Sequence, residues 1–124
     1  MTPTERQALV RSYLGKTVTI GIDRPIGYHH VKKDYTLVYP INYGYIPNVL
    51  GGDGEELDVY LMGVDHPVTE YTCKIIGIVY RHNDVEDKLI GAPVDAVYTE
   101  EQISSAIAFQ EQYYSTHVEA LYGK

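Results

Sequence analysis

The stretch that decides the fold begins with the aromatic segment Tyr39-Pro-Ile-Asn-Tyr-Gly-Tyr-Ile-Pro-Asn48 and continues into the acidic loop Gly51-Gly-Asp-Gly-Glu-Glu-Leu-Asp-Val59. Because Pro40 and Pro47 bracket the aromatic segment, we do not expect it to pair as a regular central strand. The glycines of the following loop allow the chain to turn sharply beside a ligand. We therefore interpret the rest of the chain as a scaffold that closes around this stretch.

Short runs rich in β-branched residues surround this stretch and predict strands. Capping-box sequences at Thr2-Pro-Thr-Glu5 and Thr99-Glu-Glu-Gln102 predict a helix near each end of the chain. We expect the first helix to end near Leu14, and the second to continue to Leu121 across the sheet, because its apolar residues recur at helical spacing. The segments predicted as strands are 16–22, 28–31 and 35–39 (a hairpin), 57–62, 72–80 with a bend or bulge at Gly77, and 88–92. This arrangement, mainly β with helices mostly at the ends, indicates a single domain over residues 1–124 built on a small, strongly curved, mainly antiparallel barrel.

The composition restricts the partners and the compartment. A formal charge of −7 over 124 residues argues against nucleic acid or an anionic membrane surface as a partner. The first residues are polar, unlike a signal peptide, and no apolar run approaches the ~20 residues of a membrane span. The lone Cys73 excludes an internal disulfide and fits a reducing compartment, so we expect a cytoplasmic protein. Cys73 lies in an apolar run and is interpreted as a small buried filler.

The acidic loop carries three carboxylates whose spacing suits a metal site. Asp53 and Glu55 are two residues apart, so an extended backbone points both side chains the same way, and Asp58 joins them if the chain turns in between. Hard oxygen ligands favour Mg²⁺ or Mn²⁺ over zinc. The spacing does not match an EF-hand, whose twelfth position would fall on Val64. The alternative is a solvated, charged loop without a ligand.

A second acidic group, Asp84, Glu86 and Asp87, ends at Lys88. Taken alone, it is typical of a polar hairpin tip. If the two acidic loops face each other across a cleft, they would together hold more than one cation. A site with two metal ions can activate water and bind a phosphoryl oxygen.

These residues resemble the family I soluble inorganic pyrophosphatases in four blocks. Tyr39 to Ile46 matches the family segment Y-P-x-N-Y-G-[FY]-I throughout. Asp53 to Val59 matches the acidic signature D-[SGDN]-D-[PE]-apolar-D-[small or apolar], except that Glu55 replaces an aspartate. Two weaker blocks, Asp84 to Lys88 and Phe109 to Tyr113, are similar to downstream family segments.

The resemblance, which spans roughly residues 16 to 114, implies an OB-like five-stranded barrel that hydrolyses pyrophosphate to two phosphates with Mg²⁺. It implies that Glu55 orients or deprotonates the attacking water. Its implied phosphate contacts are Tyr43, Tyr113 and Lys88, and Tyr39 would help to shape the site. The metal ligands that it implies are Asp53, Asp58 as a bridge between two ions, Asp84 or Asn83, and Glu86 or Asp87. Relatives are usually oligomers, and the apolar face of the last helix could serve an interface in a homo-oligomer, but core packing explains that face equally well, so the sequence leaves the oligomeric state open.

Several family side chains are replaced. The family cations align with Gly27, Val31 and Tyr114, and its other acidic residues with Gly21 and His29. Lys33 and Lys32 lie beside the missing arginine, and we expect Lys33 to contact the substrate, with Arg24 and Arg81 as weaker candidates. The leading hypothesis is therefore a pyrophosphatase that is slow or acts on a related phosphoanhydride. The alternatives are a non-catalytic relative that binds metal and a phosphorylated ligand or a protein partner, and a plain OB-like interaction domain.

Overall fold

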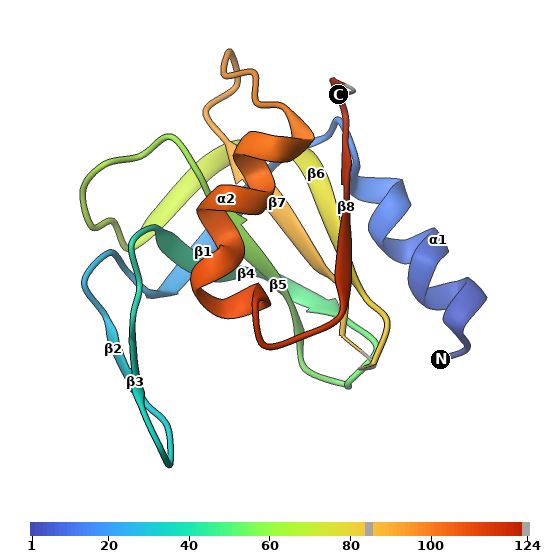
Figure 1. Cartoon of the computed structure of the whole chain (residues 1–124). Coiled ribbons are helices and arrows are strands. Elements are labelled where there is room, and N and C mark those ends of the chain that lie inside the picture. Colours follow the sequence, from blue (N-terminus) through green and yellow to red (C-terminus); the bar gives the residue numbers. More distant parts are fainter. Residues whose placement is uncertain (84–85, 123–124) are drawn as a thin grey trace.

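Five strands close into a barrel in the computed structural model, which describes residues 1–83 and 86–122 (Figure 1). Around the barrel they follow the order β1 (Thr17–Arg24), β4 (Asn42–Leu50), β5 (Glu56–Leu61), β7 (Lys88–Ala92) and β6 (Glu70–Arg81), and a β1–β6 pairing completes the ring. The β5–β7 pairing is parallel and the others are antiparallel. The predicted OB-like barrel is confirmed, with one parallel pairing that makes it a mixed sheet.

The helices begin where the capping boxes predict. Helix α1 (Pro3–Tyr13) is capped by Thr2, whose hydroxyl accepts the Glu5 N–H at 3.1 Å. Helix α2 (Glu100–Glu111) is capped in the same way by Thr99. Figure 1 shows α2 lying across the barrel and α1 beside β6. Among the described residues, neither helix is long and apolar enough to cross a membrane.

The hairpin predicted before the aromatic segment is also present. Strands β2 (His29–Val31) and β3 (Thr36–Val38) pair only with each other in the described structure. Figure 1 shows this hairpin projecting away from the barrel. The bulge predicted at Gly77 is confirmed, because the β6–β7 register shifts between Ile75 and Gly77.

The predicted continuation of the last helix to Leu121 is wrong. Helix α2 ends at Glu111, and strand β8 (Thr116–Ala120) follows and pairs with β6 from Gly77 to Arg81. The first half of the long strand β6 pairs with β1, so its second half would otherwise present unpaired backbone groups at that edge. Satisfying those groups outweighs the helical spacing of a few apolar residues.

The expectation that residues 40–47 do not form a central strand is also wrong. Strand β4 pairs with β1 on one side and with β5 on the other. Gly44 lies opposite Ile22 of β1 and opposite Val59 of β5. A Cβ atom at Gly44 would lie 1.8 Å from the Gly21 carbonyl oxygen, so a glycine is needed for this close approach. The β4–β5 register breaks between Tyr45 and Leu50, and Pro47 lies in that irregular part, where its missing N–H removes no ladder bond.

Two apolar clusters form the core, one on each side of the strands that face α2. Inside the barrel, residues such as Val59, Ile75 and Leu89 are completely buried. Outside it, Ile76 and Ile103 pack in the second cluster, which joins α2 to the barrel and includes Tyr39, Tyr43 and Tyr60. The aromatic segment identified in the sequence therefore lies under α2, at the boundary between sheet and helix.

Cys73 is expected to react with thiol reagents only after unfolding. Its side chain is fully buried in the barrel, and burial raises the pKa of the thiol to about 12. The reactive thiolate is therefore far rarer at pH 8 than in a free cysteine. Labelling with an aromatic disulfide reagent at pH 8, with and without denaturant, measures this. Rapid labelling of the native protein would contradict the buried assignment.

Candidate active site

A polar cleft opens at one end of the barrel, between the ends of β1, β4, β5 and β7, the β2–β3 hairpin and the C-terminal end of α2. It encloses about 210 Å³. Its lining residues are Asp23, Arg24, His30, Lys32, Tyr43, Asp58, Arg81, Glu86, Lys88, Gln110 and Tyr114. Of the residues predicted from the aromatic segment and from the two acidic groups, Tyr43, Asp58, Glu86 and Lys88 line this one concave site.

Lys88 is the centre of this cleft. Its buried ammonium donates hydrogen bonds to the Tyr43 hydroxyl at 2.6 Å, to Asp58 Oδ2 at 2.7 Å, and to Glu86 Oε1. Burial, together with the negative charges of Asp58 and Glu86, raises the pKa of the Tyr43 phenol well above its usual value. Tyr43 is therefore a neutral hydroxyl at physiological pH. The fold thus brings four sequence-predicted residues to a single point.

The chemistry of this point fits a hard divalent cation. Two carboxylates, Asp58 and Glu86, already converge on a positive charge, and oxygen donors of this kind suit Mg²⁺ or Mn²⁺. Within residues 1–83 and 86–122, no three acidic, histidine or cysteine side chains lie close enough together to hold an ion. Asp53 is exposed and accepts the Glu55 N–H within its own loop at 3.0 Å. Asp84 lies outside the described residues.

Asp87, the alternative to Glu86, points away from the cleft. It is buried, and its carboxylate accepts from Arg6 Nε at 2.9 Å and from the Arg81 backbone N–H at 3.1 Å. The Arg6–Asp87 bond attaches α1 to the segment that directly precedes β7. Glu86 is therefore the residue of this pair whose carboxylate faces Lys88.

Arg81 and Glu111 form a buried ion pair that the sequence did not reveal. The guanidinium donates from Nε to Glu111 Oε1 at 3.0 Å and from Nη2 to Oε2 at 2.7 Å. Its Cζ atom lies 3.6 Å from the centroid of the Tyr114 ring, which stacks on it where the family has a lysine. The two residues are 30 positions apart, so sequence spacing gives no signal for their pairing. Arg81 is therefore engaged with Glu111 rather than held ready for a phosphate.

Tyr39 lies behind the cleft lining, where it contacts the lining residues Arg24 and Tyr43. The ring is completely buried and packs against Tyr43 and Phe109. Its hydroxyl donates to Gln110 Oε1 at 2.5 Å and accepts from Arg24 Nη1 at 2.5 Å. Gln110 and Arg24 thus belong to the wall of the site, although the resemblance assigned neither of them a role.

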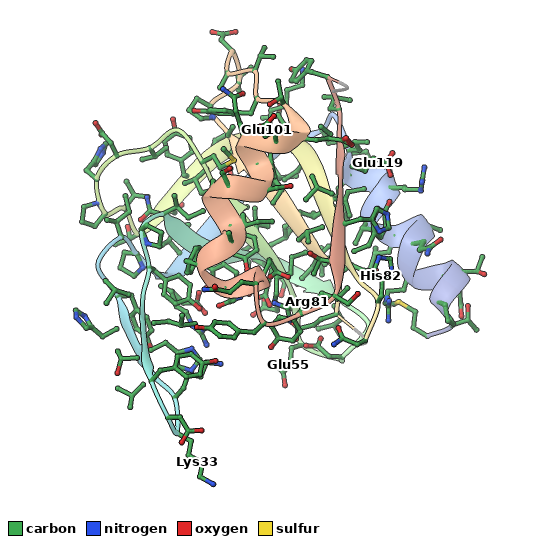
Figure 2. The ribbon with its side chains drawn as sticks, viewed as in Figure 1. Lys33, Glu55, Arg81, His82, Glu101 and Glu119 are labelled. Atoms are coloured by element: carbon green, nitrogen blue, oxygen red, sulfur yellow. The ribbon has the colours of Figure 1, made fainter. Side chains whose placement is uncertain are left out.

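Besides Tyr39 and Asp53, three predicted residues lie outside the cleft lining: Lys33, Glu55 and Tyr113. Figure 2 labels the first two of these three. Lys33 is exposed at the tip of the β2–β3 hairpin, whereas its neighbour Lys32 lines the cleft. Glu55 is exposed and points outward from the acidic loop. Tyr113 is 51% exposed and stacks on Tyr35 of the hairpin with ring centroids 4.9 Å apart. Each of the three lies on a segment at the rim of the site.

Two of the family departures have a structural explanation. A Cβ atom at Gly21 would lie 2.7 Å from Tyr45 Cζ, so the Tyr45 ring occupies the space of the absent glutamate. Val31, where the family has its arginine, is 75% exposed on the hairpin. A cation that replaces this arginine must therefore come from another position, and both Lys32 of the hairpin and Arg24 of β1 line the cleft.

Comparison with known proteins identifies the relatives of this fold. The family model "Inorganic pyrophosphatase" matches residues 15–120. The inorganic pyrophosphatase of Rickettsia prowazekii is 36% identical over 63 residues, which cover 47% of this chain and 36% of that protein. The enzyme of that name from Campylobacter jejuni is 26% identical over 106 residues, which cover 77% of this chain and 61% of that protein. The matched part therefore spans less than two thirds of the length of these curated relatives.

Solved structures share the fold. The inorganic pyrophosphatase of Ehrlichia chaffeensis superposes with a TM-score of 0.64 at 20% identity, covering 88% of each chain. That of Coxiella burnetii gives a TM-score of 0.61 at 18% identity, covering 86% of each chain. At these identities the likeness concerns the barrel and the arrangement of its elements.

Proposed function

We propose that this chain, which belongs to the inorganic pyrophosphatase family, hydrolyses inorganic pyrophosphate or a related phosphoanhydride with the help of Mg²⁺, for which Mn²⁺ can substitute. The observation that carries the proposal is the convergence of Tyr43, Asp58 and Glu86 on Lys88 within one cleft. A protein with a net charge of −7 needs bound cations to accept a substrate anion. The cleft offers oxygen ligands for such cations and donors for phosphate oxygens in the same place.

In this proposal Asp58 and Glu86 hold the metal ions, and Asp53 and Asp84 from the flanking loops complete the ligand set. When bound, the ions neutralise phosphate charge and lower the pKa of a bound water. Asp58, which accepts from Lys88 Nζ at 2.7 Å, would be the ligand shared between the ions, as the family resemblance implies. Lys88 lies at the point where Asp58 and Glu86 would hold a cation, so its ammonium would be available to a phosphoryl oxygen once these carboxylates bound an ion.

The protein side chains bind and orient the substrate. The Lys88 ammonium contacts a phosphoryl oxygen, and the neutral Tyr43 hydroxyl donates a hydrogen bond beside it. Glu55 orients the attacking water or takes its proton after the glycine-rich loop folds over the cleft. Tyr113, which follows the end of α2, and Lys33 on the hairpin approach the substrate from the rim.

The proposal is tested by measuring phosphate release from pyrophosphate with the purified protein. We expect release in the presence of Mg²⁺, none above background in excess chelator, and recovery when Mg²⁺ or Mn²⁺ is added back. A related phosphoanhydride such as a nucleoside diphosphate serves as the second substrate. Release at background from both substrates, with either metal, would exclude the catalytic proposal.

The second candidate is a non-catalytic relative that binds metal and a phosphorylated ligand or a protein partner. It is favoured by the absence of three converging metal ligands in the described part of the chain. Calorimetry with Mg²⁺ and the non-hydrolysable analogue imidodiphosphate distinguishes the two candidates. Binding without turnover supports the second candidate, whereas binding with turnover supports the enzyme.

We further propose that residues 1–124 act as one domain, in the cytoplasm and as a homo-oligomer. The family resemblance and the lone, buried Cys73 support this assignment. Because the net charge is −7, we do not propose nucleic acid or an anionic membrane as a partner. Light scattering of the purified protein measures the oligomeric state.

A further inference from the structure

Arg24 is a partly buried cation that lines the cleft at the end of β1. Its Cζ atom lies between 5.5 and 5.7 Å from the ring centroids of Tyr28, Tyr39 and Tyr43. Its Nη1 donates to the Tyr39 hydroxyl at 2.5 Å and lies 3.1 Å from His30 Nδ1. All of these neighbours are neutral or aromatic groups, so none of them neutralises the guanidinium.

The other central cations of the cleft have carboxylate partners. Lys88 is bound by Asp58 and Glu86, and Arg81 is bound by Glu111. Within residues 1–83 and 86–122, by contrast, Arg24 forms no ion pair with a carboxylate. Taking a charge out of water without an opposite charge is costly. A partly buried guanidinium that faces a polar cleft in this way is suited to an anionic ligand.

The surroundings hold Arg24 in a defined orientation. Gln110 accepts the Tyr39 hydroxyl proton, so the Tyr39 oxygen presents a lone pair to Arg24 Nη1. His30 supplies a second acceptor when its Nδ1 is unprotonated. Both bonds use Nη1. The Nε and Nη2 edge of a guanidinium matches two oxygens of a phosphoryl group. This pre-organisation lowers the entropic cost of binding.

The side-chain cations of Arg24 and Lys88 both lie near the ring of Tyr43. Arg24 Cζ is 5.6 Å and Lys88 Nζ is 5.3 Å from the centroid of the Tyr43 ring. A substrate with two linked phosphoryl groups can therefore contact one cation with each group. The family's own arginine position, Val31, is exposed on the hairpin and carries no charge.

We infer that Arg24, from β1, binds the second phosphoryl group of the substrate and replaces the arginine that is missing at Val31. This inference rests on the proposed function. It assigns the role to a residue outside the family's phosphate-binding positions, in preference to Lys33 at the hairpin tip. Arg24 acts by binding and orientation, while the chemistry takes place beside Lys88.

The test compares Arg24→Gln and Arg24→Lys with the wild type. With Arg24→Gln we expect the Kd of imidodiphosphate, measured by calorimetry with Mg²⁺, to rise about 10- to 100-fold. The KM for pyrophosphate should rise to a similar extent, while the Kd for Mg²⁺ alone stays within about twofold of the wild type because Arg24 is not a metal ligand. Arg24→Lys should recover part of the loss, since it keeps the charge without the planar fork.

Arg11→Gln is the matched control, because Arg11 is an exposed arginine on α1 that pairs with Glu119. If Arg24→Gln does not fold, Arg24→Lys keeps the test decisive through its own KM and Kd. An active wild type whose Arg24 variants bind imidodiphosphate as tightly as Arg11→Gln would overturn this inference alone. A wild type that neither hydrolyses pyrophosphate nor binds imidodiphosphate would overturn the proposed function together with it.

Discussion

Asp58→Asn is expected to reduce pyrophosphate hydrolysis about a thousandfold and to leave the fold intact. The substitution keeps the shape of the side chain and removes its charge. In the wild type this carboxylate is 2.7 Å from Lys88 Nζ and, in the proposed mechanism, bridges the metal ions. An amide oxygen is a weaker ligand for a hard cation and does not balance the Lys88 ammonium. Steady-state phosphate release with saturating Mg²⁺ measures the change.

Asp65→Asn provides the control for this experiment. Asp65 is a fully exposed aspartate outside the cleft lining, and it pairs with the neighbouring His66. We expect this variant to retain wild-type activity. Both variants should melt close to the wild type, since Asp58 is partly exposed and Lys88 keeps Glu86 and Tyr43 as partners. If Asp58→Asn kept more than about a tenth of the activity, Asp58 would not be a central ligand.

The site residues that the sequence predicts best lie within a recognisable sequence segment or on a strand that pairs with it. Tyr43 and Asp58 belong to the stretch from Tyr39 to Val59, and the strands that carry them pair directly. Lys88 joins them because β5 and β7 are neighbours in the barrel. Local pattern therefore sufficed for residues whose relative positions follow from strand pairing.

The remaining features depend on contacts between distant segments. Glu86 and Asp87 are adjacent in sequence, and their roles separate because Arg6 of α1 binds Asp87. Arg24 gains its environment from Tyr39 and, through it, from Gln110 of α2. No spacing rule connects residues that meet only after the helices pack on the barrel. The sequence therefore pointed to Tyr43, Asp58, Glu86 and Lys88 but not to the environment of Arg24 and Arg81.

The same reasoning applies to the fold. Four of the five barrel strands, all except β4, and both helix starts follow from β-branched runs and capping boxes, which are local signals. Strand β8 forms because the far half of β6 needs a partner, and Pro47 is accommodated by a break in the β4–β5 register. These outcomes depend on the completed sheet, so a few residues of helical spacing or a single proline did not reveal them.

Glu111→Gln is expected to lower the free energy of unfolding by about 3–5 kcal/mol, the typical cost of breaking a buried ion pair from one side. The Glu111 carboxylate is buried and binds the Arg81 guanidinium through both oxygens, at 3.0 and 2.7 Å. Its Oε2 also accepts the Tyr60 hydroxyl at 2.5 Å, a bond that the amide oxygen can keep. The loss therefore reports mainly on the buried charge of Arg81. Urea denaturation followed by circular dichroism measures it.

The control pair and the double variant distinguish a charge effect from a packing effect. Arg11→Gln, which breaks the exposed Arg11–Glu119 pair, should cost no more than about 1 kcal/mol. Adding Arg81→Met to Glu111→Gln should recover part of the lost stability, because the buried guanidinium that has lost its bidentate carboxylate is then removed. The recovery should be incomplete, since Arg81 also stacks on Tyr114 and lies 4.0 Å from Glu86. If Glu111→Gln lowered the free energy of unfolding as little as Arg11→Gln does, the Arg81–Glu111 pair would be solvated. The C-terminal end of α2 would then not be held at the cleft by this ion pair.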